Sequence, residues 1–350
     1  MITLTLEIES RIRITSERFH IIRSSYTRVN VFKAQLALHM RHARLNFPEN
    51  IVRSTTLPFA SLALLLCATS PLPAQQPASW TAVEDALGRK GATQPENVIK
   101  FSFPRTDLTV TARGVTLKPA FSLGSWIAFK ETGKGQVMAM GDLVLTEDEV
   151  SPVMQSLQAG GVEQTALHNH VLGELPRIMY MHISAHGDAT KIANAIHTAL
   201  ALSKTPIGAA PAAATPSAAD IDTTAVAKAL GYTGKLNGMV YQVTVPRAER
   251  ITEMEMDVLP SMGVATAINF QPTGGGKAAI TGDFVMTGGE VNQVIRALRS
   301  NGIEVTALHS HMLNESPRLF FMHFWANDDA VKLARGLRAA LDKTNSKKPG

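Results

Sequence analysis

An internal duplication constrains this chain more than any other feature of its sequence. Residues 165–182 recur as residues 306–323, and each shared residue lies 141 positions from its twin. Such a duplication predicts two copies of one structural unit, which we place at residues 81–204 and 223–344. Residues 205–222 between them are rich in Pro and Ala and have no core-forming pattern, as expected of a linker.

The order of patterns within each repeat predicts an α+β fold. Alternating β-branched and aromatic residues at 99–104 and 240–246 indicate strands at the start of each repeat. Capping boxes that begin at Thr146 and Thr287 precede apolar residues at helical spacing. The duplicated segment then predicts two strands, and a closing helix follows. Each repeat is therefore predicted to be a β-rich start followed by β-α-β-β-α, an antiparallel sheet with helices on one face. Its bare face needs a cover, for which the sister repeat is the natural candidate.

Histidines dominate the duplicated segment. Each copy reads His-x-His-x3-Glu, then Pro-Arg, then a third His. Because side chains alternate along a strand, the first two histidines point the same way, and a returning strand would bring the third towards them. Three imidazoles and a carboxylate suit a divalent metal of the zinc, iron or manganese class. The candidate ligands are His168, His170, His182, His309, His311 and His323.

Three functions remain open at this point. The first is a binding or sensing module that holds metal. The second is a metal-dependent enzyme, a hydrolase or oxygenase, in which Glu174 or Glu315 acts as the base for a metal-bound water. The third is a structural protein whose histidines pack the seam between the repeats. Arg177 and Arg318 could bind an anionic ligand, although pairing with the nearby glutamates is the favoured role.

Other residues near the motif are weaker candidates for metal ligands. Asp142 and Asp283 each follow a glycine on the preceding strand, where they could add an oxygen ligand or lie exposed. Methionines are frequent here, which raises the question of copper. Met181 and Met322 point away from the adjacent histidine by strand parity, so core packing is the expected role.

Several of these motifs together resemble one known family. Gly-Asp-Leu-Val-Leu-Thr, Thr-Ala-Leu-His-Asn-His and Pro-Arg-Ile-Met-Tyr-Met-His, with their counterparts, are similar to the LppY/LpqO family over nearly all of residues 81–344. The resemblance implies an exported bacterial protein with a tandem domain of unknown function, sometimes a lipoprotein, and implies no activity. His-x-His-x3-Glu also looks like the first metal motif of cupins. Helices interrupt the strands here, so only the idea of metal chemistry carries over.

The basic residues of the chain lie mainly at its start. Residues 1–53 hold nine Lys/Arg and four Glu, so the remainder carries 25 basic and 25 acidic residues and is neutral. A nucleic-acid binder would have a basic face in its folded part, so nucleic acid is excluded as a predicted partner. A small-molecule or envelope partner remains open.

An uncharged run at residues 57–67 follows three arginines and leads into small residues, as in a secretory signal peptide. We place this signal at residues 40–74 and expect residues 1–39 to be an over-extended start. The run is shorter than the roughly 20 residues of a transmembrane helix, and no membrane span is predicted. Leu66 before Cys67, the single cysteine, disfavours a lipid anchor. The predicted location is therefore outside the cytoplasm, periplasmic or secreted.

Overall fold

The computed structural model describes residues 80–133, 135–208 and 220–348. All the described elements belong to one compact unit, Pro73–Gly350. The predicted over-extended start, the signal peptide with Cys67 and the middle of the linker lie outside the described residues. Within the described part, none of the helices combines the length and apolar character needed to cross a bilayer.

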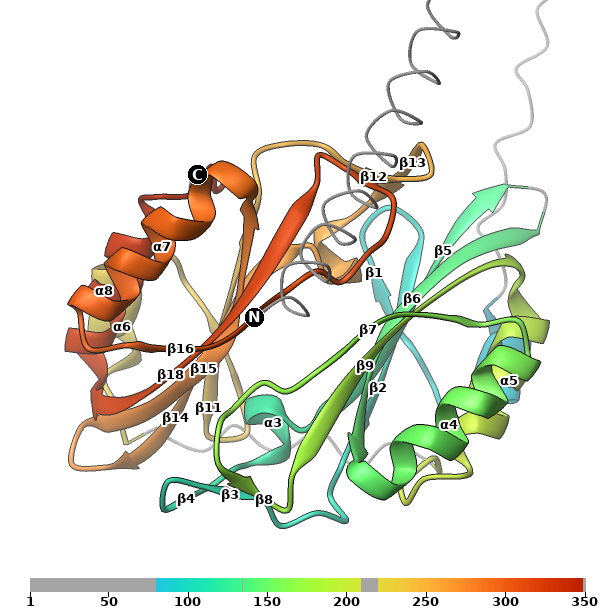
Figure 1. The fold of residues 1–350 in the computed structure, drawn as a ribbon, viewed down its shortest axis with the longest axis horizontal. Helices are drawn as coiled ribbons and strands as arrows, with labels where there is room; N and C mark the ends of the chain where they lie inside the picture. The colour runs from blue at the N-terminus through green and yellow to red at the C-terminus, as the bar shows by residue number, and fades with distance from the viewer. Residues whose placement is uncertain (1–79, 134, 209–219, 349–350) are drawn as a thin grey trace, which may run out of the picture. The chain divides into compact units, whose positions relative to one another are not determined.

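The first repeat is built on a six-stranded sheet with three helices (Figure 1). All neighbouring strands run antiparallel. In spatial order the strands are β1 (Ala92–Gln94), β2 (Val98–Pro104), β5 (Gly124–Gly133), β6 (Gln136–Thr146), β9 (Ile178–Asp188) and β7 (Glu163–His168). The helices are α2 (Thr81–Leu87), α4 (Glu147–Ala159) and α5 (Ala189–Leu200).

The second repeat has the same architecture and strand order. Its strands, in the same spatial order, are β10 (Lys235–Asn237), β11 (Val240–Pro246), β14 (Ala265–Gly274), β15 (Lys277–Thr287), β18 (Leu319–Asp329) and β16 (Glu304–His309). Its helices are α6 (Thr223–Leu230), α7 (Gly288–Ser300) and α8 (Ala330–Leu341). The predicted α+β class, with two similar antiparallel sheets and helices on one face of each, is confirmed.

Local signals in the sequence explain how the helices attach to the sheets. Both predicted capping boxes form, and the Glu149 and Glu290 carboxylates accept from the backbone N–H groups of Thr146 (2.9 Å) and Thr287 (2.7 Å). A core cluster then fills the space between the helices and the sheet in each repeat. Met181 is fully buried in one of these cores, as strand parity predicts, which stabilises the fold by about 1.5–3 kcal/mol.

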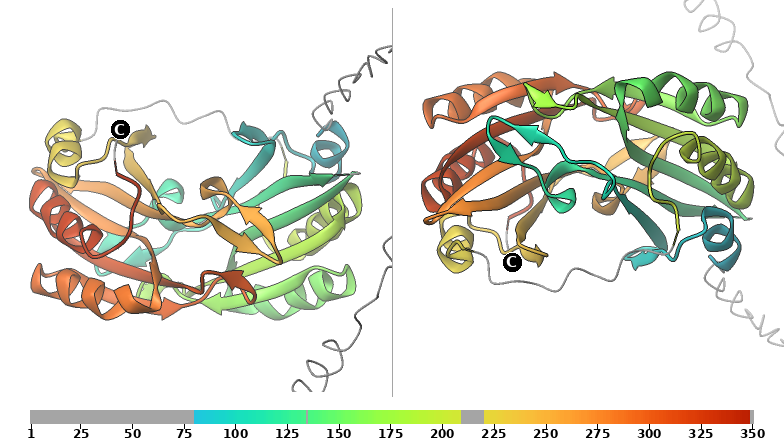
Figure 2. Two further views of the ribbon diagram at one scale, coloured as in Figure 1. Left: turned by 90° about the horizontal axis from the view of Figure 1, so that it is seen from above. Right: turned by 90° about the horizontal axis from the view of Figure 1, so that it is seen from below.

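A short arm projects from each repeat. Arm 1 contains β3 (Thr111–Ala112), β4 (Val115–Thr116) and α3 (Pro119–Ser122), and arm 2 contains β12 (Ile251–Glu253), β13 (Met256–Val258) and the 3₁₀ turn η1 (Pro260–Met262). Each arm pairs with a two-residue strand of its own repeat, β8 (Glu174–Leu175) or β17 (Glu315–Ser316). These arms lie on the face of the sheets opposite to the helices (Figure 2).

Each arm packs between the two sheets and so covers part of the sheet of the other repeat. Phe121 of arm 1 packs edge-on against Trp325 of β18, with ring centroids 6.0 Å apart. Met262 of arm 2 shares a buried cluster with Met138 and Met140 of β6. A hydrogen bond also joins arm 1 to the other sheet: the Lys118 N–H donates to the Gln271 side chain of β14 at 2.8 Å. The bare sheet faces are thus buried reciprocally, and the seam between the repeats lies there.

Candidate metal centre

The strand register places an aspartate beside the third histidine of each repeat. Asp142 on β6 is the direct cross-strand partner of His182 on β9, and Asp283 on β15 is the partner of His323 on β18. Directly opposed residues share one face of a sheet, so each pair points away from the helices and into the seam. A glycine precedes each aspartate, and a Cβ at Gly282 would lie 1.9 Å from the Ala267 carbonyl oxygen. The Gly-Asp pair therefore allows the close strand approach that sets the carboxylate in place.

The six predicted histidines meet in one cluster drawn from both repeats. Three close pairs, two stacked and one tilted, cross the seam, and their ring centroids are 3.6 to 3.8 Å apart. The pairs are His168 with His309, His170 with His323, and His182 with His311. Exchanging the two repeats turns the second pair into the third and leaves the first unchanged. The cluster is thus approximately twofold symmetric, and neither repeat forms it alone.

Aromatic rings hold the outer imidazoles in place. Tyr180 stacks on His170 at 3.3 Å between centroids, and Phe321, its twin, stacks on His311 at 3.6 Å. The Thr306 hydroxyl also donates to the His170 carbonyl oxygen across the seam at 2.6 Å. These contacts restrict the torsions of the rings before any ligand binds.

The two aspartates lie within reach of the histidines but form no hydrogen bond with them. Asp142 Oδ1 is 3.8 Å from His182 Nε2, and its Oδ2 is 3.9 Å from His170 Nε2. Asp283 Oδ2 is 3.5 Å from His311 Nε2, and its Oδ1 is 3.9 Å from His323 Nδ1. Ordinary N–H···O hydrogen bonds are 2.7–3.2 Å long. The three separations that involve Nε2 instead suit donors that share an ion.

Burial shifts the pKa values of the histidines and aspartates in the cluster. Burial lowers the pKa of His168 to about 4 and that of His309 to about 3, and it holds the pKa of the other four imidazoles well below 6.5. The imidazoles are therefore neutral at pH 7, and neutral nitrogens are the ones that bind metal. Burial raises the pKa of Asp142 to about 7 and raises that of Asp283 well above its usual value.

One lysine breaks the symmetry between the repeats. Lys100 on β2 lies over the Trp126 ring at 4.0 Å and donates to the Ser261 carbonyl oxygen of arm 2 at 3.1 Å. Burial lowers the pKa of this amine to about 8, and its charge in turn opposes the rise in the pKa of Asp142. The corresponding residue of β11 is Gln242. Lys100 could not be selected from the sequence, because the twin position in the second repeat holds an uncharged residue, Gln242.

Buried atoms without a hydrogen-bond partner gather in this cluster. Seven such side-chain atoms lie there within the described part of the chain: Asp142 Oδ1, His168 Nε2, His170 Nε2, His182 Nε2, Asp283 Oδ1, His309 Nδ1 and His323 Nε2. Each buried unsatisfied group costs about 1–3 kcal/mol, and native proteins contain few of them. A bound cation would satisfy nitrogens and carboxylates together, so the donor set fits a metal.

Hydrogen bonds on the far side of the rings support the same conclusion. His323 Nδ1 lies 2.7 Å from the Gly282 carbonyl oxygen, which can only accept, so the proton is on Nδ1 and the lone pair on Nε2. His168 Nδ1 has a longer contact of this kind with the Asn169 carbonyl oxygen, at 3.3 Å. Metal-binding histidines commonly donate their other N–H in this way.

Three groups of side chains in the described residues bring donor atoms within 4.8 Å of one another. These groups are His168/His182/His309/His311, His168/His170/His323 and Asp283/His311/His323. All six predicted histidines occur in these groups, together with Asp283. The sequence had left open whether this aspartate is a ligand or an exposed residue. The first two groups take histidines from both repeats, whereas the third lies within the second repeat.

The two glutamates of the motif lie outside these three groups. Glu174 Oε1 accepts from the Ile178 N–H at 3.4 Å, and Glu315 Oε1 accepts from the Leu319 N–H at 2.9 Å. Each glutamate thereby closes the turn that contains a cis proline, at Pro176 or Pro317. Burial raises the pKa of the Glu174 carboxyl.

The two arginines also lie outside the groups. Arg318 pairs with Glu315 at 3.1 Å, as the sequence suggested. Arg177 instead lies 3.7 Å from Glu147, and both side chains are exposed. Neither arginine appears among the residues that line the cavity at the cluster.

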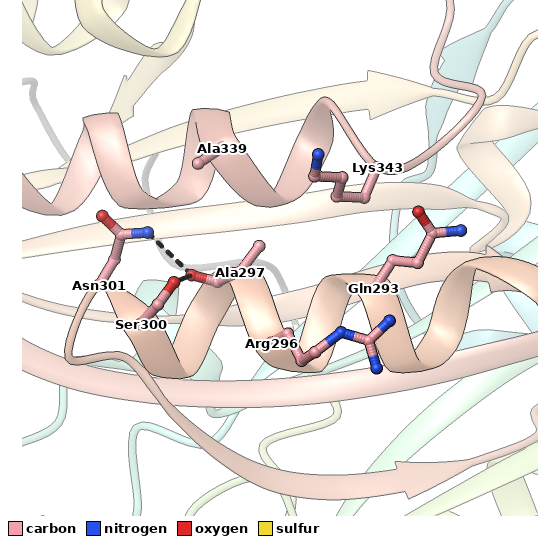
Figure 3. A pocket seen from close by; sticks show the side chains of 7 residues that line it. All are labelled: Gln293, Arg296, Ala297, Ser300, Asn301, Ala339 and Lys343. Atoms are coloured by element: carbon pink, nitrogen blue, oxygen red, sulfur yellow. Dashed lines mark hydrogen bonds between the residues drawn. The ribbon is translucent and has the colours of Figure 1, made fainter.

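Space at the cluster is limited. A cavity of about 10 Å³ lies beside His182 and His311, between Trp126 and Gly263. That is roughly the room needed for one water molecule. The larger hollow, about 450 Å³, lies elsewhere, between α7 and α8 (Figure 3). Its lining of small, amide and cationic side chains has no metal-binding character.

Comparison with known proteins gave one family and two distant structures. A family model described as Domain of Unknown Function (DUF1259) matches residues 81–202 and 224–343, one copy for each repeat. The match confirms a tandem domain of unknown function, and the LppY/LpqO name stays a prediction. A comparison with curated proteins gave no match.

The two solved structures are only distantly similar to this chain. A trimeric bacterial microcompartment shell protein, PduB, has 14% identity and a TM-score of 0.20, with 72% of this chain and 89% of that chain covered. EtuB from Clostridium kluyveri has 10% identity and a TM-score of 0.17, with 72% and 88% covered. At such low TM-scores neither likeness bears on the function.

Proposed function

We propose, from the premise that the chain belongs to this family of unknown function, that it is a binding protein for a divalent metal of the zinc, iron or manganese class. The metal would be held by histidines of both repeats at their seam. One observation carries the proposal: seven buried nitrogen and oxygen atoms without hydrogen-bond partners face one another among six imidazoles and two carboxylates.

The chemistry of the donors favours metal over packing alone. Neutral imidazoles and carboxylates are the ligands preferred by zinc, iron and manganese, and none of the donors is a sulfur. Six histidines that only packed the seam would leave these lone pairs facing one another in a low-dielectric interior, where such groups are costly. A cation removes that cost and joins the repeats at the same time.

A binding role is favoured over an enzymatic one. The cavity at the cluster has room for roughly one water molecule, which leaves no space for an organic substrate. The glutamates considered as bases direct an oxygen to backbone N–H groups. His309 is partly exposed whereas His323 is 2% exposed, so the cluster reaches from the surface to the interior and offers an ion a route inwards.

We also propose that the protein is exported. The support is the sequence pattern of residues 40–74. Outside the cytoplasm, a centre without thiolates would be insensitive to oxidation of cysteine, which suits this location.

Metal content of the purified full-length chain tests the proposal. After chelation and reloading with zinc or manganese, the wild type should retain metal on desalting, as measured by elemental mass spectrometry. A His168→Ala/His309→Ala variant should lose most of it, because this pair lies at the centre of the cluster. His186→Ala is the matched control, since His186 lies four residues from His182 on β9 and is exposed.

Thermal unfolding provides a second measurement. An ion at 100 times its dissociation constant stabilises the folded state by about 2.7 kcal/mol. For a protein of this size, that raises Tm by about 5–10 °C. Wild type that neither retains metal nor gains Tm would show that the histidines only pack the seam.

A further inference from the structure

We propose that the centre is dinuclear, with Asp142 bridging two metal ions and Asp283 binding at site A. This inference rests on the proposed metal-binding function and specifies its stoichiometry. Site A is defined by His182 and His311, and site B by His170 and His323. The remaining pair, His168 and His309, lies between the two sites.

The number and arrangement of the imidazoles exceed what one ion uses. A zinc ion takes four protein ligands in a closed tetrahedral site, and the six imidazoles and two carboxylates together also exceed the six donors of an octahedral ion. The group His168/His182/His309/His311 already supplies four, and it leaves out both histidines of site B. Those two form a separate group with His168. The histidines thus supply two sets, and the third group, Asp283/His311/His323, joins one histidine of each site.

The approximate twofold symmetry leads to the same division. The ring centroids of His182 and His311 are 3.6 Å apart, and those of His170 and His323 are 3.8 Å apart. Exchange of the repeats interchanges these pairs, so whatever one pair binds, the other is built to bind as well. A single ion that respects this symmetry would have to lie on the axis, near His168 and His309. Such an ion would leave donor atoms at both outer pairs without a partner.

A carboxylate supplies the bridge. One oxygen of Asp142 faces His182 of site A at 3.8 Å, and its other oxygen faces His170 of site B at 3.9 Å. Asp283 repeats only the half at site A, with one oxygen 3.5 Å from His311 Nε2. Its other oxygen is 3.9 Å from His323 Nδ1, the nitrogen that donates to Gly282. Two donors bound at about 2.1 Å to one ion lie about 3–3.5 Å apart, so small torsional changes complete each site.

A bridged pair of ions also fits the space and the charge. Carboxylate-bridged ions lie about 3.5–4 Å apart in two-metal sites. The cavity of about 10 Å³ beside His182 and His311 has roughly the room for one water-derived ligand on site A. The two aspartates together offset half of the charge of two divalent ions, and such a ligand as hydroxide would offset more.

Manganese titration of the full-length protein tests the inference. Retained metal should reach two ions per chain. His182→Ala/His311→Ala and His170→Ala/His323→Ala should each reduce it to one, and the two variants should match because the symmetry relates them. One ion per chain in the wild type would overturn the dinuclear centre while leaving the proposed function intact, and none would overturn both.

Electron paramagnetic resonance needs no variant and therefore does not depend on how well a variant folds. The second equivalent of Mn²⁺ should replace the six-line signal of an isolated ion by the broad spectrum of a coupled pair. Two retained ions that keep isolated-ion spectra would rule out the Asp142 bridge. Circular dichroism of each variant, compared with His186→Ala, checks that lost metal is not lost folding.

Discussion

Replacing Asp142 by Asn should change stability in opposite directions with and without metal. In the metal-free protein, burial raises the pKa of Asp142 from 3.8 to about 7. Each pKa unit is worth about 1.4 kcal/mol, so the ionised carboxylate costs the folded state on the order of 4 kcal/mol above pH 7. Asn carries no charge and removes this cost, although its buried amide forfeits part of the gain. We expect metal-free Asp142→Asn to be more stable than wild type by about 2–4 kcal/mol at pH 8.

The pH dependence of this difference follows from linkage. The folded pKa of Asp142 lies above the unfolded value, so the folded state holds a proton that the unfolded state has released between about pH 4 and pH 7. The contribution of Asp142 to stability therefore falls as the pH rises through this window. The advantage of the Asn variant should be near zero at pH 4 and complete above pH 7.

Metal should reverse the order. The variant lacks the charge and the two oxygens that would bind the ions, so we expect its affinity for Mn²⁺ to fall at least about 100-fold, or about 2.7 kcal/mol. Urea unfolding in chelator at pH 4 and pH 8, and manganese titration at pH 8, measure both effects. Asp85→Asn, at an exposed position on α2, is the control. A metal-free variant no more stable than wild type at pH 8, or unchanged manganese affinity, would refute the reasoning.

Three further predictions concern stability. Arg105→Met should destabilise the protein by about 3–5 kcal/mol in urea unfolding while leaving metal stoichiometry intact, because it leaves the buried Glu149 carboxylate without its bidentate partner. Gly282→Ala should abolish retained metal and lower Tm more than any single histidine variant, because its Cβ would meet the Ala267 carbonyl oxygen. Unfolded histidines take up protons near pH 6.5, whereas burial holds the pKa of His168 at about 4. Metal-free wild type should therefore lose stability in urea as the pH falls from 6.5 to 4, since the six imidazoles outnumber the two carboxyls that act in the opposite direction.

Local signals in the sequence were sufficient to predict the plan of each repeat. Helix starts depend on a few neighbouring residues, and both capping boxes formed where they were predicted. Strand parity likewise placed Met322 in the core beneath the helices and His323 on the opposite face. The ionic anchor of Arg105 and Glu149 was missed because the two residues lie 44 positions apart, and no local pattern connects them.

The histidines of the site could be selected from the sequence, but their grouping could not. Alternation along a strand determines which face a residue occupies, and it says nothing about what that face meets. The aspartates were left undecided between ligand and exposed residue for this reason. Their burial depends on the seam, which arms 1 and 2 create by packing across it. Lys100 could not be identified from the sequence, because its effect on the site depends on its being close to Asp142 in space.

The reciprocal packing of the arms decides how the histidines are shared. Each sheet must bury an apolar face, and the arm of the other repeat supplies part of its cover. This exchange brings the two histidine-bearing faces against each other about an approximate twofold axis. A histidine therefore meets its closest partner across the seam, as His182 meets His311, and the ring centroids of His168 and His182 within one repeat are 5.1 Å apart. A sequence repeat alone is compatible with one site in each copy, and the apolar faces are what make the sites shared.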